Sequence, residues 1–241
     1  MKKLLSLLFV VLITLASLCL YGCEKKPVPQ QSGVKNQALV DVIPKQYIDD
    51  PASIGKPYIM INGGIPVFEE KMFGLREAEV YSELDRLGRC GPAYAVITRN
   101  TMPTEKRGKI GMIKPSGWHT VRYDDLIKDK YLYNRCHLIG FQLAGENDNN
   151  KNLITGTRYL NVDGMLPFEN MVTKYVKDTG KPVLYRVVPI FKGDDLVARG
   201  VTIEGYSLND KGKSICFFVF VPNIQPGVVI NYANGASKRA K

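Results

Sequence analysis

Three apolar segments of strand length follow one another in the last third of the chain. Val183–Ile190, Gly200–Leu208 and Ile215–Val221 are rich in β-branched and aromatic side chains, and turn-forming residues over 209–212 separate the last two. Consecutive strands that are joined by turns pair antiparallel. The sequence therefore predicts an antiparallel meander at the centre of the fold and argues against a regular βαβ alternation.

Other segments extend this pattern toward the N-terminus. Tyr58–Asn62 and Ala93–Thr98 have the composition of strands, and Glu77–Leu87 is predicted as a short helix. Pro167–Lys177 is predicted as a longer helix, because a proline stands in its first turn and Gly180 follows as a stop signal. The expected fold class is α+β, with a mainly antiparallel central sheet flanked by helices.

The first residues have the pattern of an export signal. Lys2 and Lys3 precede one apolar run, which is too short for a stable membrane span. Gly22 and Cys23 then resemble the lipobox of bacterial lipoproteins, and a cleaved signal without lipidation at Cys23 is the alternative. We expect three parts: a signal peptide of the lipoprotein type over 1–23, a flexible linker over 24–46 and one domain over 47–241.

The composition excludes several classes of protein. Hydrophobic residues make up 45% and charged residues 23%, which excludes a mostly disordered chain. A single long apolar run excludes a polytopic membrane protein. Five cysteines in 241 residues are too few for a disulfide-built scaffold. Cys90, Cys136 and Cys216 fall in the expected domain, and the sequence leaves open whether any two of them pair or all are small buried residues.

The charge of the chain favours a polyanionic partner. Its 33 lysines and arginines exceed its 23 aspartates and glutamates, so the formal net charge is +10. Such a surface attracts polyphosphates without reading sequence, in a salt-dependent manner. A basic stretch that could cradle a phosphate backbone, or could be an ordinary solvated loop, contains Lys106, Arg107, Lys109, Lys114 and Arg122. Tyr131, Tyr133 and Tyr159 follow nearby and are expected to pack within the protein.

Histidine is scarce in this chain, which makes His137 informative. The other histidine, His119, follows the sole tryptophan, and we expect a structural role for it. The segment 133–141 is typical of extended chain, so Arg135 and His137 should lie on one face. Arginine binds phosphate oxygens and imidazole can take a proton from water, so the pair suits an anionic substrate. Taken alone, such a pair is more typical of an ordinary surface.

A polar segment downstream offers a ligand for a hard cation. Leu153–Asn161 is predicted as a short helical or turn segment, and Glu169 stands in the first turn of the next predicted helix. The Asn161 amide oxygen suits Mg²⁺, which takes few protein oxygens and keeps several waters. Glu169 could orient those waters. Asn161 alone would be interpreted as a helix cap or a turn residue.

Several of these segments together resemble a known family. The stretches 134–140, 152–154 and 157–161, followed by Glu169, are similar to the DNA/RNA non-specific endonucleases, whose ββα-metal (His-Me) finger carries an Asp-Arg-Gly-His motif. The similarity runs from about residue 62 to residue 234, and the subgroup is that of Gram-positive secreted or DNA-entry nucleases. The resemblance implies an α+β fold with a ββα-metal finger as its active site.

The resemblance also implies roles for individual residues. His137 matches the general base, Asn161 the ligand of Mg²⁺ or Mn²⁺, and Glu169 the acidic helper. Asn152 matches a supporting asparagine, Arg135 the motif arginine, and Arg158 is a second candidate phosphate contact. Two positions depart from the motif, because Asn134 replaces its aspartate and Cys136 its glycine. Cys136 should point away from His137 and pack in the core, which would leave catalysis intact.

The expected function is that of an extracellular, metal-dependent endonuclease. It would hydrolyse phosphodiester bonds of DNA and RNA without sequence specificity, from the outer face of the bacterial membrane or as a secreted protein. The alternative is a non-catalytic basic surface lipoprotein that binds nucleic acid. Only the enzyme would lose cleavage with a chelator or with Asn161→Ala. No protein partner is inferred from the sequence.

Overall fold

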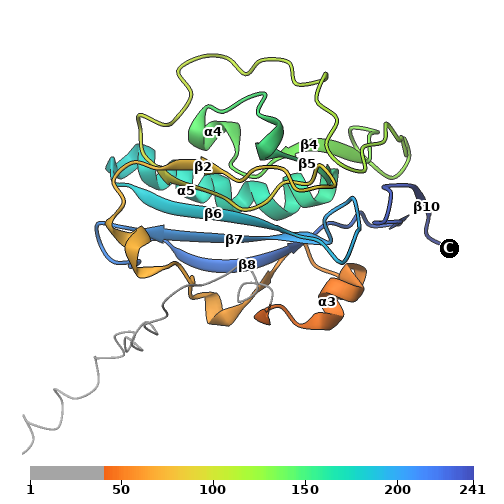
Figure 1. The fold of residues 1–241 in the computed structure, drawn as a ribbon, viewed down its shortest axis with the longest axis horizontal. Coiled ribbons are helices and arrows are strands. Elements are labelled where there is room, and N and C mark those ends of the chain that lie inside the picture. The colour runs from red at the N-terminus through yellow and green to blue at the C-terminus, as the bar shows by residue number, and fades with distance from the viewer. Residues whose placement is uncertain (1–40) are drawn as a thin grey trace, which may run out of the picture. The chain divides into compact units, whose positions relative to one another are not determined.

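The computed structural model describes residues 41–241 (Figure 1). The expected signal peptide with Cys23, and all but the end of the expected linker, lie outside the described residues. Within residues 41–241 no helix is long and apolar enough to cross a membrane. Packing begins slightly before residue 47, because Ile43 is already buried against β8 residues such as Phe218.

A six-stranded antiparallel sheet forms the centre of the fold, which confirms the predicted α+β class (Figure 1). Its strand order is β1-β8-β7-β6-β3-β2. The strands are β1 (Ile59–Met60), β2 (Glu79–Tyr81), β3 (Ala93–Ile97), β6 (Val183–Ile190), β7 (Gly200–Ser207) and β8 (Cys216–Pro222). The predicted meander is β6-β7-β8, with Val187, Ile203 and Val219 in register across it.

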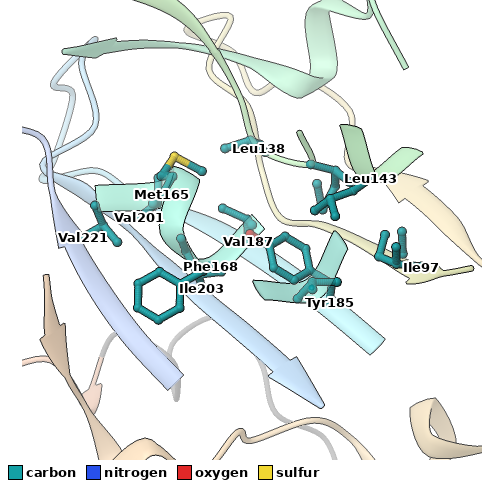
Figure 2. Close-up of a cluster of buried hydrophobic side chains, with 14 of the residues drawn as sticks. Ile97, Leu138, Leu143, Met165, Phe168, Tyr185, Val187, Val201, Ile203 and Val221 are labelled. Carbon is teal, nitrogen blue, oxygen red and sulfur yellow. The ribbon is translucent and has the colours of Figure 1, made fainter. Parts of the chain in front are cut away.

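One face of the sheet is covered by helix α5 (Leu166–Thr179). Proline in its first turn and Gly180 in a left-handed conformation at its end set its limits, as the sequence predicted. Its buried face carries Phe168 and Val172, which belong to the same core cluster as Tyr185 and Ile203 of the sheet. Figure 2 shows Phe168 beside these sheet side chains.

The opposite face of the sheet is covered by the N-terminal segment. Helix α3 (Lys45–Asp49) and short 3₁₀ turns pack there against residues of β6 and β8. A buried ion pair of the sheet binds this segment. Arg186 and Glu204 lie opposite each other in β6 and β7, and Arg186 Nε is 2.5 Å from Glu204 Oε2. Glu204 also accepts a bond from the Val67 amide at 2.7 Å, and Arg186 donates to the Val67 carbonyl at 3.2 Å.

A separate two-stranded hairpin lies ahead of α5 in sequence. Strands β4 (Tyr133–His137) and β5 (Leu153–Thr157) pair antiparallel, and the π-helix Leu160–Met165 joins β5 to α5. The helical or turn structure predicted over Leu153–Asn161 is therefore wrong for its first five residues, which form β5. Pairing with β4 decides this: Gly156 pairs with Asn134, and its lack of a side chain leaves room for the nearby Cys136 side chain.

The helix predicted over Glu77–Leu87 is also wrong. Residues 79–81 form the edge strand β2, where Val80 pairs with Tyr94 of β3. The chain then turns at Asp85, whose carboxylate accepts bonds from the Leu87 and Arg89 amides. Long-range strand pairing and a side-chain turn thus override a weak local helix pattern.

The remaining elements are short. They are helix α4 (Phe141–Ala144), strands β9 (Val228–Ile230) and β10 (Ser237–Arg239), and the 3₁₀ turns Pro51–Ile54, Asn62–Gly64, Glu70–Gly74 and Asn150–Asn152. Strands β9 and β10 form a hairpin near the C-terminus. Residues 101–116 contain no helix or strand, as the sequence predicted.

Candidate active site

His137 is the last residue of β4, and both of its ring nitrogens have partners. Nε2 lies 2.8 Å from the Asn147 carbonyl oxygen, and Nδ1 lies 3.1 Å from Nη2 of Arg107. A carbonyl only accepts and a guanidinium only donates, so Nε2 carries the proton and Nδ1 presents its lone pair. The surroundings therefore fix the tautomer in which Nδ1 is the basic nitrogen.

The environment of His137 also keeps the ring neutral. The side chain is 5% exposed, and this burial lowers its pKa to about 4, with a smaller contribution from the Arg107 charge. The bond to Asn147 acts in the opposite direction without cancelling the effect of burial. At neutral pH the imidazole is therefore uncharged and able to accept a proton.

Arg107 connects His137 to an open hollow of about 430 Å³. The hollow is also lined by Asn134, Arg135, Arg158 and Asn161. The sequence placed Arg107 in a basic stretch without a specific role. The structure brings its guanidinium to the general-base candidate from a loop 30 positions earlier in the chain.

Asn161, in the π-helix, lies against the other face of β4. Its Nδ2 donates to Asn134 Oδ1 at 3.1 Å, and its Oδ1 lies 3.1 Å from Cys136 Sγ. Asn134 and Cys136 alternate with Arg135 and His137 along the strand. Within residues 41–241, Asn161 and His137 thus share no hydrogen bond. Arg107 links them, because it contacts His137 and lines the same hollow as Asn161.

Glu169 lies in the first turn of α5 and is almost fully buried. Gln142 Nε2 donates to its carboxylate at 3.2 Å, and burial raises the Glu169 pKa to about 7. The bond from Gln142 and the charge of Arg107 oppose that rise. A side chain at Gly140 would approach the carboxylate to 2.6 Å, so glycine is needed where α4 begins.

Asn152 is fully buried, and its side-chain amide forms hydrogen bonds with the protein backbone. Its Oδ1 accepts from the Ile139 amide at 2.8 Å, and its Nδ2 donates to the Ile139 carbonyl at 3.0 Å. These bonds fix the chain two residues after His137. Asn152 is therefore placed to position the base rather than to contact a substrate.

Arg135 is likewise engaged within the protein. Its guanidinium stacks on Trp118 at 4.1 Å and donates to the carbonyls of Gly111 and Ile113, at 2.7 Å for Gly111. It thus ties the loop that carries Arg107 to strand β4. Arg158 differs from Arg135 in its partner. It also lines the hollow, but its guanidinium pairs with the partly exposed carboxylate of Asp129, 2.5 Å away.

Cys90 and Cys136 are buried but Cys216 is exposed, so the alternative in which all three cysteines are buried does not hold. No disulfide joins Cys90, Cys136 and Cys216 in the described part of the chain. Cys136 packs in the main core, as predicted, and burial raises the pKa of its thiol. His119 lies 2.9 Å from the Asn234 carbonyl, which ties it to the C-terminal turn.

The donor set fits a cation that keeps most of its water. Within residues 41–241 no group of three or more His, Cys, Asp or Glu is placed to hold a metal ion. Asn161 lines the hollow, its Nδ2 donates to Asn134, and its Oδ1, 3.1 Å from Cys136 Sγ, is an uncharged oxygen donor. A hydrated Mg²⁺ or Mn²⁺ needs only one or two such oxygens plus substrate phosphate. The residues present therefore fit such an ion.

The fold and the ββα arrangement of β4, β5 and α5 define a nuclease of the ββα-metal type. The family model for the DNA/RNA non-specific endonuclease matches residues 70–209, which is more than half of the chain. The chain belongs to the DNA/RNA non-specific endonuclease family.

Solved structures of nucleases share this fold. NucA from Streptococcus agalactiae with magnesium bound matches with a TM-score of 0.69 and 22% identity, over 88% of this chain and 99% of that one. NucA without metal matches with a TM-score of 0.66 and 24% identity, over 81% of this chain and 96% of that one. Sda1 nuclease with bound zinc matches with a TM-score of 0.59 and 29% identity, over 68% of this chain and 82% of that one.

Proposed function

We propose that this protein is an extracellular, metal-dependent endonuclease that hydrolyses DNA and RNA without reading their sequence. Membership of the nuclease family supports phosphodiester hydrolysis. The observation that carries the assignment of the base is the tautomer of His137, whose Nδ1 lone pair points to Arg107. A buried neutral imidazole with a fixed tautomer is suited to take a proton from water.

The contact between Arg107 and His137 suggests how substrate starts the reaction. In the free protein the guanidinium occupies the lone pair of Nδ1. A phosphodiester in the hollow would draw Arg107 onto its oxygens, because a charge-assisted bond to phosphate is stronger than one to neutral imidazole. A water molecule would then take the place of Arg107 at Nδ1.

Hydrolysis then follows from proton transfer to His137. Nδ1 accepts a proton from the water as its oxygen attacks phosphorus, and the Asn147 carbonyl stabilises the resulting imidazolium through Nε2–H. The bond from phosphorus to the 3′ oxygen breaks, and that oxygen takes a proton from solvent. The products are a 5′-phosphate and a 3′-hydroxyl end.

Asn161 and Glu169 would hold the divalent ion. Asn161 would supply the one protein oxygen, and the buried Glu169 carboxylate would orient coordinated waters. When bound, the ion would stabilise negative charge on the phosphate oxygens. Magnesium in NucA and zinc in Sda1 support a divalent ion without fixing its identity here.

The arginines of the hollow divide into two roles. Arg158 would share the phosphate charge by exchanging its Asp129 partner for a phosphate oxygen. Arg135 would keep the Arg107 loop in place through the carbonyls that it binds. Without Lys2 and Lys3 of the expected signal, the net charge of +10 becomes 10 − 2 = +8, which supports salt-sensitive binding without base recognition.

Export and membrane attachment belong to the same proposal. The signal pattern over 1–23 and the lipobox-like Cys23 support a lipid-anchored or secreted enzyme. A solved structure described as an extracellular endonuclease shares the fold, with a TM-score of 0.53 and 20% identity. Labelling with a palmitate analogue tests the anchor, since wild type should be labelled and Cys23→Ala should not.

The activity test uses circular DNA, linear DNA and RNA with and without EDTA. We expect Mg²⁺-dependent cleavage of all three, loss of cleavage with EDTA, and loss with Asn161→Ala. Salt-sensitive DNA binding without any cleavage would instead support the non-catalytic lipoprotein. Mn²⁺ and Zn²⁺ added separately would identify the ion that supports turnover.

A further inference from the structure

The hollow beside Asn161 has an aromatic side that the hydrolysis of a phosphodiester does not require. Trp118, Tyr131 and Tyr133 line it together with the arginines. Two of these rings are used by the protein itself. Tyr133 is buried and its hydroxyl donates to the Gly235 carbonyl at 2.9 Å, and Trp118 is covered by the Arg135 guanidinium at 4.1 Å.

Tyr131 is different, because 46% of it is exposed. Its backbone bridges to Arg122, whose guanidinium lies 5.5 Å from the Tyr131 ring centroid. Two bonds to Asp124, of 3.0 and 2.7 Å, hold that guanidinium. Tyr131 thus lies beside a cation that is paired with Asp124, and it still presents ring surface at the hollow, where the sequence predicted only packing.

The size and charge of the hollow suit one nucleotide. Its volume of about 430 Å³ is near the lower end of small-molecule sites. Arg107 and Arg158 line the same hollow and suit phosphate oxygens. Cations for a phosphate and an open ring for an adjacent base therefore occur in one place.

We propose that Tyr131 forms a nucleobase subsite, on which an unpaired base next to the cut phosphate stacks. This inference rests on the proposed function and specifies its substrate as unpaired or locally unstacked nucleic acid. Stacking tolerates every base, so the subsite is consistent with cleavage that ignores sequence. A duplex must first expel a base from its stack, which costs free energy.

Binding without turnover tests the subsite. The full chain in EDTA is titrated with an end-labelled oligothymidylate and with an abasic strand of the same length, and anisotropy gives each Kd. Trp118 is the sole tryptophan, so its fluorescence reports separately on bases entering the hollow. We expect the base-containing strand to bind about tenfold more tightly than the abasic strand.

Variants of Tyr131 then separate stacking from charge. Tyr131→Ala should lose about tenfold on the oligothymidylate, with little change on the abasic strand or on a duplex. Tyr131→Phe keeps the ring and should bind as wild type does. Met60→Ala, which removes a 54% exposed side chain from β1, is the matched control and should change nothing.

Two outcomes would overturn the subsite. One is equal affinity of wild type for the base-containing and abasic strands. The other is an equal loss on both strands in Tyr131→Ala, which would show that the ring acts only through the fold or through Arg122. A wild-type protein that stacks bases but never cleaves would refute the proposed function alone, and one that cleaves without base-dependent binding would refute the subsite alone.

Discussion

Two regions of this molecule bury ionisable side chains, and they do so in opposite ways. In the central sheet, Arg186 and Glu204 neutralise each other and also bond to Val67, so their polar atoms are matched by partners. Within reach of the Arg107 charge, His137 and Glu169 are buried without an ion pair, and burial displaces their pKa values to about 4 and about 7.

The difference separates a structural pair from a reactive one. A buried charge with a matched counterion is stable and unreactive, whereas a buried group without one is shifted toward its uncharged form. The strand that carries His137 is fixed by Asn152 and Arg135, which use their own polar groups on backbone atoms.

The largest expected effect is loss of cleavage on removal of the base. His137→Ala should reduce the rate of plasmid cleavage about 10²–10⁴-fold, because no other group accepts the proton from water. His119→Ala, the other histidine, should cleave at the wild-type rate, since its ring bonds to the Asn234 carbonyl of the C-terminal turn. A wild-type rate in His137→Ala would remove His137 from the mechanism.

Breaking the structural pair should affect stability rather than chemistry. Glu204→Gln leaves the Arg186 guanidinium buried without its counterion, and urea unfolding should show a loss of about 3–5 kcal/mol. Lys174→Ala, which removes the exposed pair of Lys174 with Asp178, should leave the unfolding midpoint unchanged. An unchanged midpoint in Glu204→Gln would show that the buried pair does not stabilise the fold.

The two reactive groups should make stability depend on pH with opposite signs. The His137 pKa lies below the unfolded value of 6.5, so its contribution is present above pH 6.5 and is lost as the pH falls toward 4. The Glu169 pKa lies above the unfolded value of 4.5, so its contribution is present below pH 4.5 and is lost as the pH rises through 7. Each effect corresponds to at most about 3 kcal/mol.

Metal-free unfolding curves between pH 4 and 8 measure both effects. Relative to wild type, Glu169→Gln should gain stability as the pH rises above 5, and His137→Gln should gain stability as the pH falls below 6. Curves for the two variants that stay parallel to the wild-type curve would show that neither group is displaced from its ordinary pKa.

The smallest expected effect concerns the orientation of the metal ligand. Asn134→Ala removes the acceptor that holds the Asn161 amide, so the Kd for Mg²⁺ in calorimetry should rise about tenfold. Asn134→Asp keeps an acceptor at that position and should bind at least as tightly as wild type. Equal Kd values in Asn134→Ala and wild type would mean that Asn161 needs no such support.

The contrast between local and distant contacts also explains what the sequence could predict. The meander and α5 were predicted because their signals are local: strand composition between turns, and a helix bounded by proline and Gly180. Residues 79–81 and 153–157 became strands through pairing with distant partners, which no local pattern shows.

The site shows the same limit. The residues of the motif were found because the spacing of His137, Asn152, Asn161 and Glu169 resembles that of a known family. The contact of Arg107 with His137 was missed because it depends on how a loop without regular structure folds back over β4. Tyr131 was expected to pack, and only the three-dimensional structure distinguishes it from the buried Tyr133.

Chemical rescue tests the central claim most directly. His137→Ala is assayed for plasmid cleavage with Mg²⁺ in the presence of rising concentrations of imidazole, with His119→Ala as the parallel control. If Nδ1 of His137 is the base, added imidazole should restore part of the lost rate in His137→Ala and should not change His119→Ala. A variant that cleaves as wild type does, or an inactive variant that imidazole never rescues although it binds DNA and Mg²⁺ normally, would contradict the account.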